Sequence, residues 1–284
     1  MPRYELTYPK GDRNTVNRYK HQATYSLRTI HSIINTSAVL HVSFQPSPTD
    51  PFPVILPLIG QMGSYARPSA DEGEVLECYL HGYVSSRIMN LCRTQPAATD
   101  EAMAVASSPD GLPVCIAAAK VDGLVLSLTP NSHNYNYRSA ILFGHATLVS
   151  AADEKQWAME LITNSVVAGR WTQTRVPPNS AEMASTQILK VVVDSGSAKV
   201  REGVPTDDVA DLENGELLDR VWTGVLPVYE QFGDPVPGPY NRLQVVPEHV
   251  RLYKEGLNKL NREYAEAAAR KDAPVKRMSP GEDD

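Results

Sequence analysis

The sequence predicts a mostly β protein, an antiparallel barrel with flanking helices, and three observations carry that prediction. Six or seven short apolar runs have the alternation and the turn boundaries of strands. Two or three segments have helical spacing, and one of them lies between strands as an interior crossover. No GxGxxG or Walker loop occurs in the sequence, which disfavours the usual nucleotide-binding α/β sheet.

The first half of the chain opens with a polar arm over residues 1–17. Apolar residues at helical spacing then predict a short helix over 25–35, and an alternating run predicts a strand over 38–44. The next two strands, over 53–60 and 75–80, have the arrangement of a hairpin around a polar turn.

The strand over 53–60 carries an internal proline, Pro57. Because proline has no backbone N–H for the strand ladder, Pro57 indicates one of three situations. The strand lies at a sheet edge, it contains a bulge, or a ligand approaches its backbone at this point.

The second half of the chain begins with a loop of low hydrophobicity over 94–111. Asp122-Gly123 lies between two strand candidates and is a strong hairpin signal. Ser150–Asp153 resembles a capping box, and apolar residues after it give the following helix an inward face. The strands expected here cover 114–119, 124–128, 139–149, 188–200 and 221–228, with a polar loop over 130–136.

A long amphipathic helix is expected from Pro247 onward, because its apolar and aromatic residues step by three and four. This heptad-like seam fits packing on the helix's own domain and a subunit contact equally well. The residues of the seam are Val250, Tyr253, Leu257, Leu260 and Tyr264. The chain therefore divides into an N-terminal arm over 1–17, a barrel domain over 18–240, a C-terminal helical extension over 241–270 and a tail over 271–284 expected to be disordered.

Composition excludes several classes of protein. The formal net charge of −6 argues against a nucleic-acid partner, which would require a basic surface. The three cysteines are far apart without a CxxC motif, and the histidines lack ligand spacing. We therefore expect no disulfide framework, no metal site and a reducing compartment. No apolar run has the length of a signal peptide or a membrane span, so we expect a cytoplasmic protein without a membrane partner.

The most informative segment runs from the strand over 75–80 through His-Gly into a helix over 85–93. The first amides of a helix have no internal partners, and its positive end favours a phosphate. The helix opens on two serines, whose hydroxyls can donate to phosphate oxygens, and on Arg87, whose guanidinium can donate twice. The alternative is an ordinary N-cap, because serine is a common capping residue.

Four segments, in this order, resemble the pyridoxamine 5′-phosphate oxidase-like, FMN-binding split-barrel superfamily. Within it, the chain is most similar to the branch of nitroimidazole-resistance proteins and flavin-nucleotide-binding homologues. The segments are Pro53–Gly60 ("VVPM"), Tyr79–Gly82 with Ser85–Arg87 ("FHG…SRK"), Tyr137–Ala146 with Glu154-Lys155 ("YRSV…GxA…EK") and Trp222–Val228 ("WxGVxP"). Each motif alone is weak, but their order and spacing make the resemblance specific over residues 18–240.

The resemblance implies a six-stranded antiparallel split barrel that forms a homodimer, with FMN at the subunit interface. By position, Ser85, Ser86 and Arg87 would hold the flavin phosphate. The other implied cofactor-binding residues are Pro57, Leu58, Ile59 and Gly60 at the isoalloxazine edge, His81 and Gly82 near the ring, and Tyr137, Arg138, Ser139 and Trp222 in the pocket wall. Where the family often has lysine after the arginine, this chain has Ile88, which removes one positive charge from the phosphate site.

Not all of these residues need to contact the flavin. Arg138 serves equally well in an ion pair, and the indole of Trp222 is more typical of core or dimer packing than of stacking on a flavin.

The function implied by the resemblance is an FMN-dependent oxidoreductase acting on a small organic substrate. His81 is the candidate catalytic residue, either donating to the flavin or moving a proton, with a structural hydrogen bond as the alternative. Two other functions remain open: a non-catalytic flavin- or haem-binding protein, and a scaffold dimer that has lost its ligand. Pyridoxamine phosphate oxidase activity itself is disfavoured, because the expected arginine-rich C-terminal segment is missing and the chain ends in acidic residues.

Overall fold

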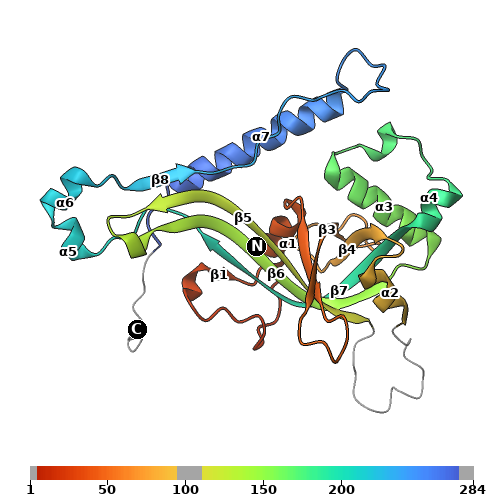
Figure 1. The fold of residues 1–284 in the computed structure, drawn as a ribbon, viewed down its shortest axis with the longest axis horizontal. Helices are drawn as coiled ribbons and strands as arrows, with labels where there is room; N and C mark the ends of the chain where they lie inside the picture. The colour runs from red at the N-terminus through yellow and green to blue at the C-terminus, as the bar shows by residue number, and fades with distance from the viewer. Residues whose placement is uncertain (1–4, 95–110, 275–284) are drawn as a thin grey trace. The chain divides into compact units, whose positions relative to one another are not determined.

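The computed structural model describes residues 5–94 and 111–274. Figure 1 shows the fold with its helices and strands labelled. The chain separates into two compact units. Unit 1 comprises residues 1–15, 24–118 and 139–198, and unit 2 comprises 16–23, 119–138 and 199–284. The predicted loop over 94–111 and the predicted disordered tail over 271–284 fall almost entirely outside the described residues.

Six antiparallel strands form a closed β-barrel, as the sequence predicts. The order around the ring is β7-β4-β3-β2-β5-β6, and pairing of β6 with β7 closes it. Two extra strands are added: β1 (Ala23–Thr24) pairs with β7, and β8 (Gly224–Pro227) pairs with β5. The six barrel strands are β2 (Leu40–Phe44), β3 (Val54–Gly63), β4 (Glu77–Tyr83), β5 (Leu112–Leu126), β6 (Asn134–Leu148) and β7 (Thr186–Arg201).

Alternation along the strands fills the inside of the barrel with apolar side chains. On β2, every second residue is buried, and these residues pair with β3 at Leu40–Leu58, Val42–Leu56 and Phe44–Val54. Successive side chains of a strand point to opposite faces, so this register puts one set inside and leaves the other on the outer face. The fully buried side chains on this inner face include Leu40, Leu80, Ile116, Leu142 and Leu189.

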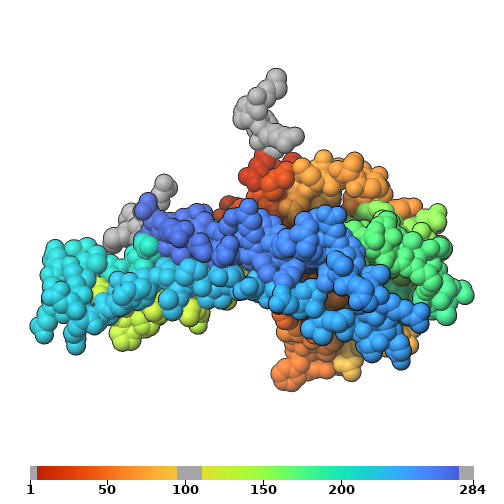
Figure 2. Space-filling model, turned by 90° about the horizontal axis from the view of Figure 1, so that it is seen from above, coloured from red at the N-terminus to blue at the C-terminus, as the bar shows by residue number. Residues whose placement is uncertain are grey.

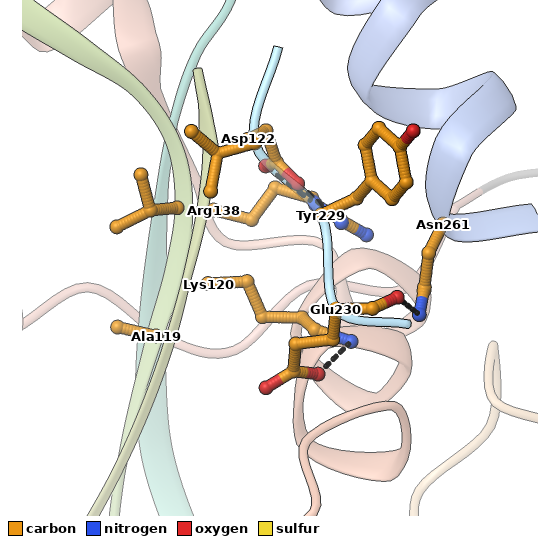
Figure 3. Close-up of a pocket in the computed structure, with 9 residues that line it drawn as sticks. Ala119, Lys120, Asp122, Arg138, Tyr229, Glu230 and Asn261 are labelled. Atoms are coloured by element: carbon orange, nitrogen blue, oxygen red, sulfur yellow. Dashed lines mark hydrogen bonds and ion pairs between the residues drawn. The ribbon is translucent and has the colours of Figure 1, made fainter. Parts of the chain in front are cut away.

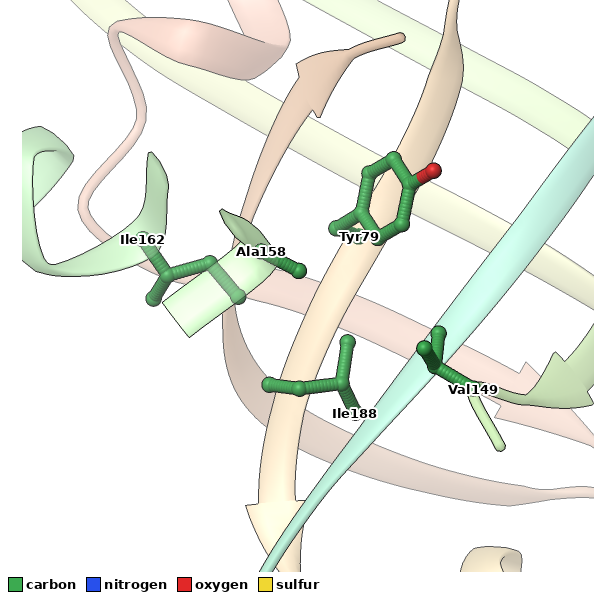
Figure 4. Close-up of a cluster of buried hydrophobic side chains, with 5 residues drawn as sticks. All are labelled: Tyr79, Val149, Ala158, Ile162 and Ile188. Atoms are coloured by element: carbon green, nitrogen blue, oxygen red, sulfur yellow. The ribbon is translucent and has the colours of Figure 1, made fainter. Parts of the chain in front are cut away.

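Helices cover part of the outer face of unit 1. The helix α3 (Ala152–Val166) packs on β4 and β7 through a cluster of Tyr79, Val149, Ala158, Ile162 and Ile188 (Figure 4). Unit 1 also contains α1 (Leu27–Asn35), α2 (Arg87–Thr94), α4 (Ser180–Ser185) and the 3-10 turn η4 (Trp171–Gln173). The predicted helix over 25–35 is confirmed as α1, which begins after Ser26, whose hydroxyl accepts from Thr29 N at 3.3 Å.

Unit 2 is built around the predicted C-terminal helix, α7 (Glu248–Ala269). Figure 2 shows α7 beside the extended segment that precedes it, and Asn258 fixes this arrangement by hydrogen bonds to Phe232 N and O at 2.7 and 2.9 Å. Two seam residues pack within the unit: Tyr253 lies edge-on to Phe232, and Tyr264 lies under Arg138. The other helices are α5 (Val209–Leu212), α6 (Gly215–Arg220), η1 (Lys20–Gln22) and η3 (Pro130–Ser132).

The predicted hairpin at Asp122-Gly123 is wrong, because β5 runs straight through these residues. Tertiary contacts override the local turn signal. Asp122 forms an ion pair with Arg138 on β6, and Gly123 lies so close to β8 that a Cβ would be 2.8 Å from Val225 Cγ1.

Two of the three situations indicated by Pro57 are also excluded. β3 is not an edge strand, since it lies between β2 and β4, and its register to β2 runs without a bulge. The pairing of β3 with β4 begins only at Ile59, so Pro57 lies beyond the end of that ladder. A proline without an N–H is tolerated there.

Two boundaries differ from the prediction. The expected capping box at Ser150–Asp153 is absent because α3 begins one residue later, which puts Ala151 at the N-cap without a side-chain bond. β6 begins at Asn134 rather than at 139, so three of the seven residues of the expected loop, 134–136, belong to the strand. In the described residues, no helix is both long and apolar enough to cross a bilayer.

Candidate functional site

The turn between β4 and α2 has the geometry expected of an anion site. β4 ends at Tyr83 and α2 begins at Arg87. Ser86 N donates to Tyr83 O at 2.9 Å, and Ser86 O accepts the first bond of the helix from Asn90 N at 3.1 Å. The next amides therefore form the open N-terminal end of α2, where a helix has donors without internal acceptors and a positive potential.

The hydroxyl of Ser86 does not make the contact of an ordinary N-cap. Its Oγ atom is buried and has no hydrogen-bond partner among the described residues. An N-cap serine would accept from an amide of the first turn, and Ser86 does not. A buried hydroxyl left unpaired costs on the order of 1–3 kcal/mol, so an acceptor at this position would stabilise the turn.

Arg87 supplies the positive charge of this turn. Its side chain is exposed, and in the described part of the chain it has no ion-pair partner within 4.0 Å. Ser85 is exposed beside it. The turn thus combines an arginine, two hydroxyls and helix amides, which is the donor set that phosphate groups use in proteins.

Packing beneath α2 makes the turn rigid. Ile88 and Met89 are fully buried, and Gly82 leaves no room for a side chain, because a Cβ would lie 2.6 Å from Met89 Cε. Arg93 also holds the turn, because its guanidinium donates to Val84 O at 3.1 Å. The burial of Ile88 also explains the departure from the family pattern, since a lysine at this position would point into the core.

His81 lies on the outer face of the barrel, directly opposite Ile59 in the register of β3 and β4. Exposed side chains surround it: Ile59 is 42% and Tyr83 63% exposed, and Pro57 is exposed as well. Desolvation lowers the pKa of His81, so its imidazole is neutral near pH 7. This outer-face patch, defined here as Pro57, Ile59, His81 and Tyr83, is unusually apolar for a solvent-exposed surface.

The two other residues predicted on β3 face the opposite way. Leu58 pairs with Leu40 on the inner side of the barrel. Gly60 is buried, and a Cβ there would lie 2.8 Å from Tyr79 O, so only glycine lets β3 and β4 approach this closely. Only the backbone of these two residues can therefore contribute to a site on the outer face.

The remaining predicted residues have separate surroundings. Arg138 forms a bidentate ion pair with Asp122 at 2.6 and 2.9 Å, so the ion-pair alternative for Arg138 describes its observed contacts. Tyr137 is half-buried, and Trp222 is 64% exposed just before β8. These three residues belong to unit 2 and Ser139 belongs to unit 1. Their contact with a cofactor stays a prediction.

Two polar features were not predicted from the sequence. Glu154, in the first turn of α3, accepts from Tyr79 Oη and Lys190 Nζ, both at 2.8 Å. In unit 2, a pocket forms around Lys120 and Asp122 (Figure 3). The sequence signal for this pocket was the pair Lys120 and Asp122, two charged residues on one face of an otherwise apolar strand.

Comparison with known proteins gives one family and several similar structures. A family model for pyridoxamine 5′-phosphate oxidase matches residues 26–200. No curated protein matches the chain. The flavocytochrome Anf3 from Azotobacter vinelandii is 25% identical with a TM-score of 0.66, over 86% of this chain and 97% of that one. An FAD and haem binding protein from Mycobacterium smegmatis is 24% identical with a TM-score of 0.62, over 82% of this chain and 97% of that one.

A more distant match is a putative 5-nitroimidazole antibiotic resistance protein from Bacteroides thetaiotaomicron. It is 18% identical with a TM-score of 0.42, over 63% of this chain and 86% of that one. The matches to the first two structures cover more of the chain than the family model does, so they extend beyond the barrel.

Proposed function

The chain belongs to the pyridoxamine 5′-phosphate oxidase family, and we propose that it is a flavin-binding protein that holds the cofactor phosphate at the turn between β4 and α2. The unpartnered hydroxyl of Ser86 is the observation that carries the proposal, because it is a buried donor at the open end of a helix. Support comes also from the two similar structures, which are named for a flavocytochrome and for FAD and haem binding.

The residues present fit a flavin phosphate. Ser86 Oγ and the first amides of α2 would donate to its oxygens, and Arg87 would neutralise its charge. The outer-face patch would offer apolar contacts to a ring system, with the neutral imidazole of His81 as a hydrogen-bonding group. A bound flavin supplies hydride or single-electron chemistry, and the protein's part is to position it.

A homodimer with the flavin at its interface remains part of the proposal. The patch exposes Ile59 and Tyr83 on the outer face of the barrel, and a second copy would bury this apolar surface. FMN is the cofactor that the resemblance implies, whereas the relative from Mycobacterium smegmatis is named for FAD. A phosphate site of this kind fits both molecules, because each carries a phosphate on its ribityl chain.

The comparisons favour the flavin- or haem-binding alternative over an oxidoreductase acting on a small substrate, because the names of both similar structures state cofactors and no substrate. Haem is therefore the second candidate ligand. Its test is whether the purified protein shows a Soret band, and whether His81→Ala removes it.

The experiment that tests the main proposal is the visible spectrum of the purified protein, followed by chromatography of the released cofactor. We expect flavin bands, and we expect Arg87→Ala to weaken flavin retention by about tenfold or more, the size of one lost charge-assisted contact. The matched control is Arg28→Ala, which removes an exposed arginine paired with Asp71 in the same unit. A protein that takes up neither FMN nor FAD, or an Arg87→Ala variant that retains the flavin fully, would overturn the proposal.

A further inference from the structure

Unit 1 contains a pocket of about 240 Å³ on the barrel, and the flavin proposal uses none of its lining residues. Its floor is formed by β2, β5 and β6, which are consecutive strands of the ring, and segments before β1 and before β3 complete it. The volume corresponds to roughly eight molecules of liquid water, which suits a small organic molecule. The lining includes Arg13, Ser43, Pro113, Cys115, Phe143 and His145.

Alternation along the strands turns one set of side chains outward into this pocket. Ser43 and Cys115 lie directly opposite each other in the register of β2 and β5. Phe44, the next residue of β2, is buried inside the barrel, so Ser43 and Cys115 are on the outer face. Phe143 and His145 are half-buried and two residues apart on β6, so they share that face. The pocket therefore collects side chains from three neighbouring strands.

Arg13 is a cation whose backbone is held beside the pocket by the next residue of the chain. The buried Asn14 donates through Nδ2 to Pro9 O at 2.8 Å and to Gly196 O on β7 at 2.9 Å. The guanidinium of Arg13 lies 6.0 Å from the ring centre of Phe143, and it has no hydrogen bond or ion pair with the described residues. Its position near the ring is thus restricted, while its donors stay available.

His145 contributes a ring nitrogen to the same pocket. Gly144 allows β6 to approach β7 closely, because a Cβ at this position would overlap Val192 O. His145 Nδ1 then lies 3.0 Å from Asp194 Oδ2 on β7, off the line of a hydrogen bond. The other nitrogen, Nε2, has no hydrogen-bond partner in the described part of the chain and is not buried, so it is open to a ligand.

Four polar groups of the pocket therefore make no hydrogen bond to the residues that the structure describes. They are the Arg13 guanidinium, Ser43 Oγ, Cys115 Sγ and His145 Nε2. A few convergent polar groups beside apolar and aromatic side chains are typical of small-molecule sites. No carboxylate lines this pocket, so the charge of Arg13 is not neutralised within it.

The geometry points to a binding site for a small aromatic carboxylate, with its carboxylate on Arg13 and its ring against Phe143. The planar guanidinium of an arginine can donate twice to one carboxylate. Phe143 and Pro113 offer apolar contacts to a ring, and Ser43 and His145 can bond a polar substituent on it. One carboxylate also matches the single charge of Arg13. This site is separate from the flavin proposal and stands without it.

The test titrates benzoate calorimetrically into the full-length protein, in a buffer free of phosphate and of other carboxylates, with benzamide as the neutral counterpart. We expect benzoate to bind and benzamide to bind at least about tenfold more weakly, because the carboxylate makes the principal contact. Arg13→Gln should weaken benzoate binding by a similar factor, and folding is not at stake because Arg13 is exposed. Phe143→Leu should weaken it severalfold, because it removes the aromatic face and keeps an apolar side chain.

Cys115→Met adds atoms at the floor of the pocket without changing its charge, and it should block benzoate binding. The matched control is Arg67→Gln, which removes an exposed arginine paired with Glu74 in the same unit and should leave binding unchanged. The inference is overturned if benzoate does not bind, if benzamide binds equally well, or if Arg13→Gln or Cys115→Met leaves benzoate binding unchanged. Equal binding of acetate would overturn the role of the ring, and tighter binding of inorganic phosphate would overturn the assignment to carboxylates.

Discussion

The turn between β4 and α2 and the pocket of unit 2 differ in whether their cations lie beside carboxylates of the described chain. At the turn, Arg87 is exposed and has no carboxylate partner in the described part of the chain, and Ser86 has a buried donor without an acceptor. In the pocket, Arg138 and Lys120 each lie beside a carboxylate of the chain itself. We propose an anion for the first site, whereas the cations of the second already have carboxylates of the chain beside them. We therefore expect stability and ligand affinity to respond differently to substitution in the two regions.

The largest expected effect is on the stability of unit 2. Asp122→Ala leaves the guanidinium of Arg138 largely buried without its carboxylate, which should cost about 3–5 kcal/mol of unfolding free energy. Urea denaturation measures this loss, and the double variant with Arg138→Met should recover much of it. If the single variant loses less than about 1 kcal/mol, the value expected for an exposed pair, Asp122 and Arg138 are not the buried pair described here.

The second largest effect is a pH dependence that arises in unit 1. His31 is fully buried, between Tyr8 Oη at 2.7 Å and Glu72 O at 2.8 Å, and desolvation lowers its pKa to about 4. The unfolded chain takes up a proton near pH 6.5, while the folded chain does so only near pH 4. Stability should therefore fall by about 3 kcal/mol as the pH drops through this range.

Tryptophan fluorescence measures this pH effect in unit 1 alone when Trp222 is replaced by phenylalanine, because the other two tryptophans, Trp157 and Trp171, belong to unit 1. His31→Gln should flatten the pH dependence between 6.5 and 4. An unchanged slope in that variant would show that another group titrates.

A third effect separates affinity from stability at the turn. Arg87→Ala should change the unfolding free energy of the flavin-free protein by less than about 0.5 kcal/mol, because the side chain is exposed and breaks no ion pair. The same variant should lose about 1.4 kcal/mol or more of flavin binding energy. A large loss of stability would mean that Arg87 has a structural role, contrary to the comparison.

The smallest effect has an unusual sign. Ser86→Ala should stabilise the flavin-free protein by about 1 kcal/mol, because it removes a buried hydroxyl that has no partner. It should also weaken flavin binding several times over. Thermal unfolding with and without flavin measures both, with Ser85→Ala as the control, since Ser85 is exposed. Destabilisation of the flavin-free protein would show that Ser86 acts as a cap.

The barrel and the turn between β4 and α2 could be predicted because their signals are local. Alternation along β2 and β4 indicates which side chains face inward. A strand followed by His-Gly and two serines indicates that a helix follows, although α2 begins at Arg87, two residues later than predicted. The burial of Ile88 was not accessible in this way, because it depends on which side of a short helix faces the barrel.

The pocket of unit 2 and the course of β5 could not be predicted, because distant residues decide them. Lys120 meets Glu230 only when the segment after β8 lies against β5, and Asp122-Gly123 stays extended only because Arg138 and Val225 lie beside it. A dipeptide that favours a turn carries no information about these partners.

The closure of the barrel by β6 and β7 limits how copies of this protein can associate. Each of the six ring strands has two neighbours in the ring, so the edges without a neighbouring strand are those of the added strands β1 and β8. Association through the outer face of the ring would use side chains, and the outer-face patch is an apolar candidate for it. Unlike a sheet with open edges, such a surface can be switched off by a single charged substitution, for example Ile59→Lys, while the ring itself stays intact.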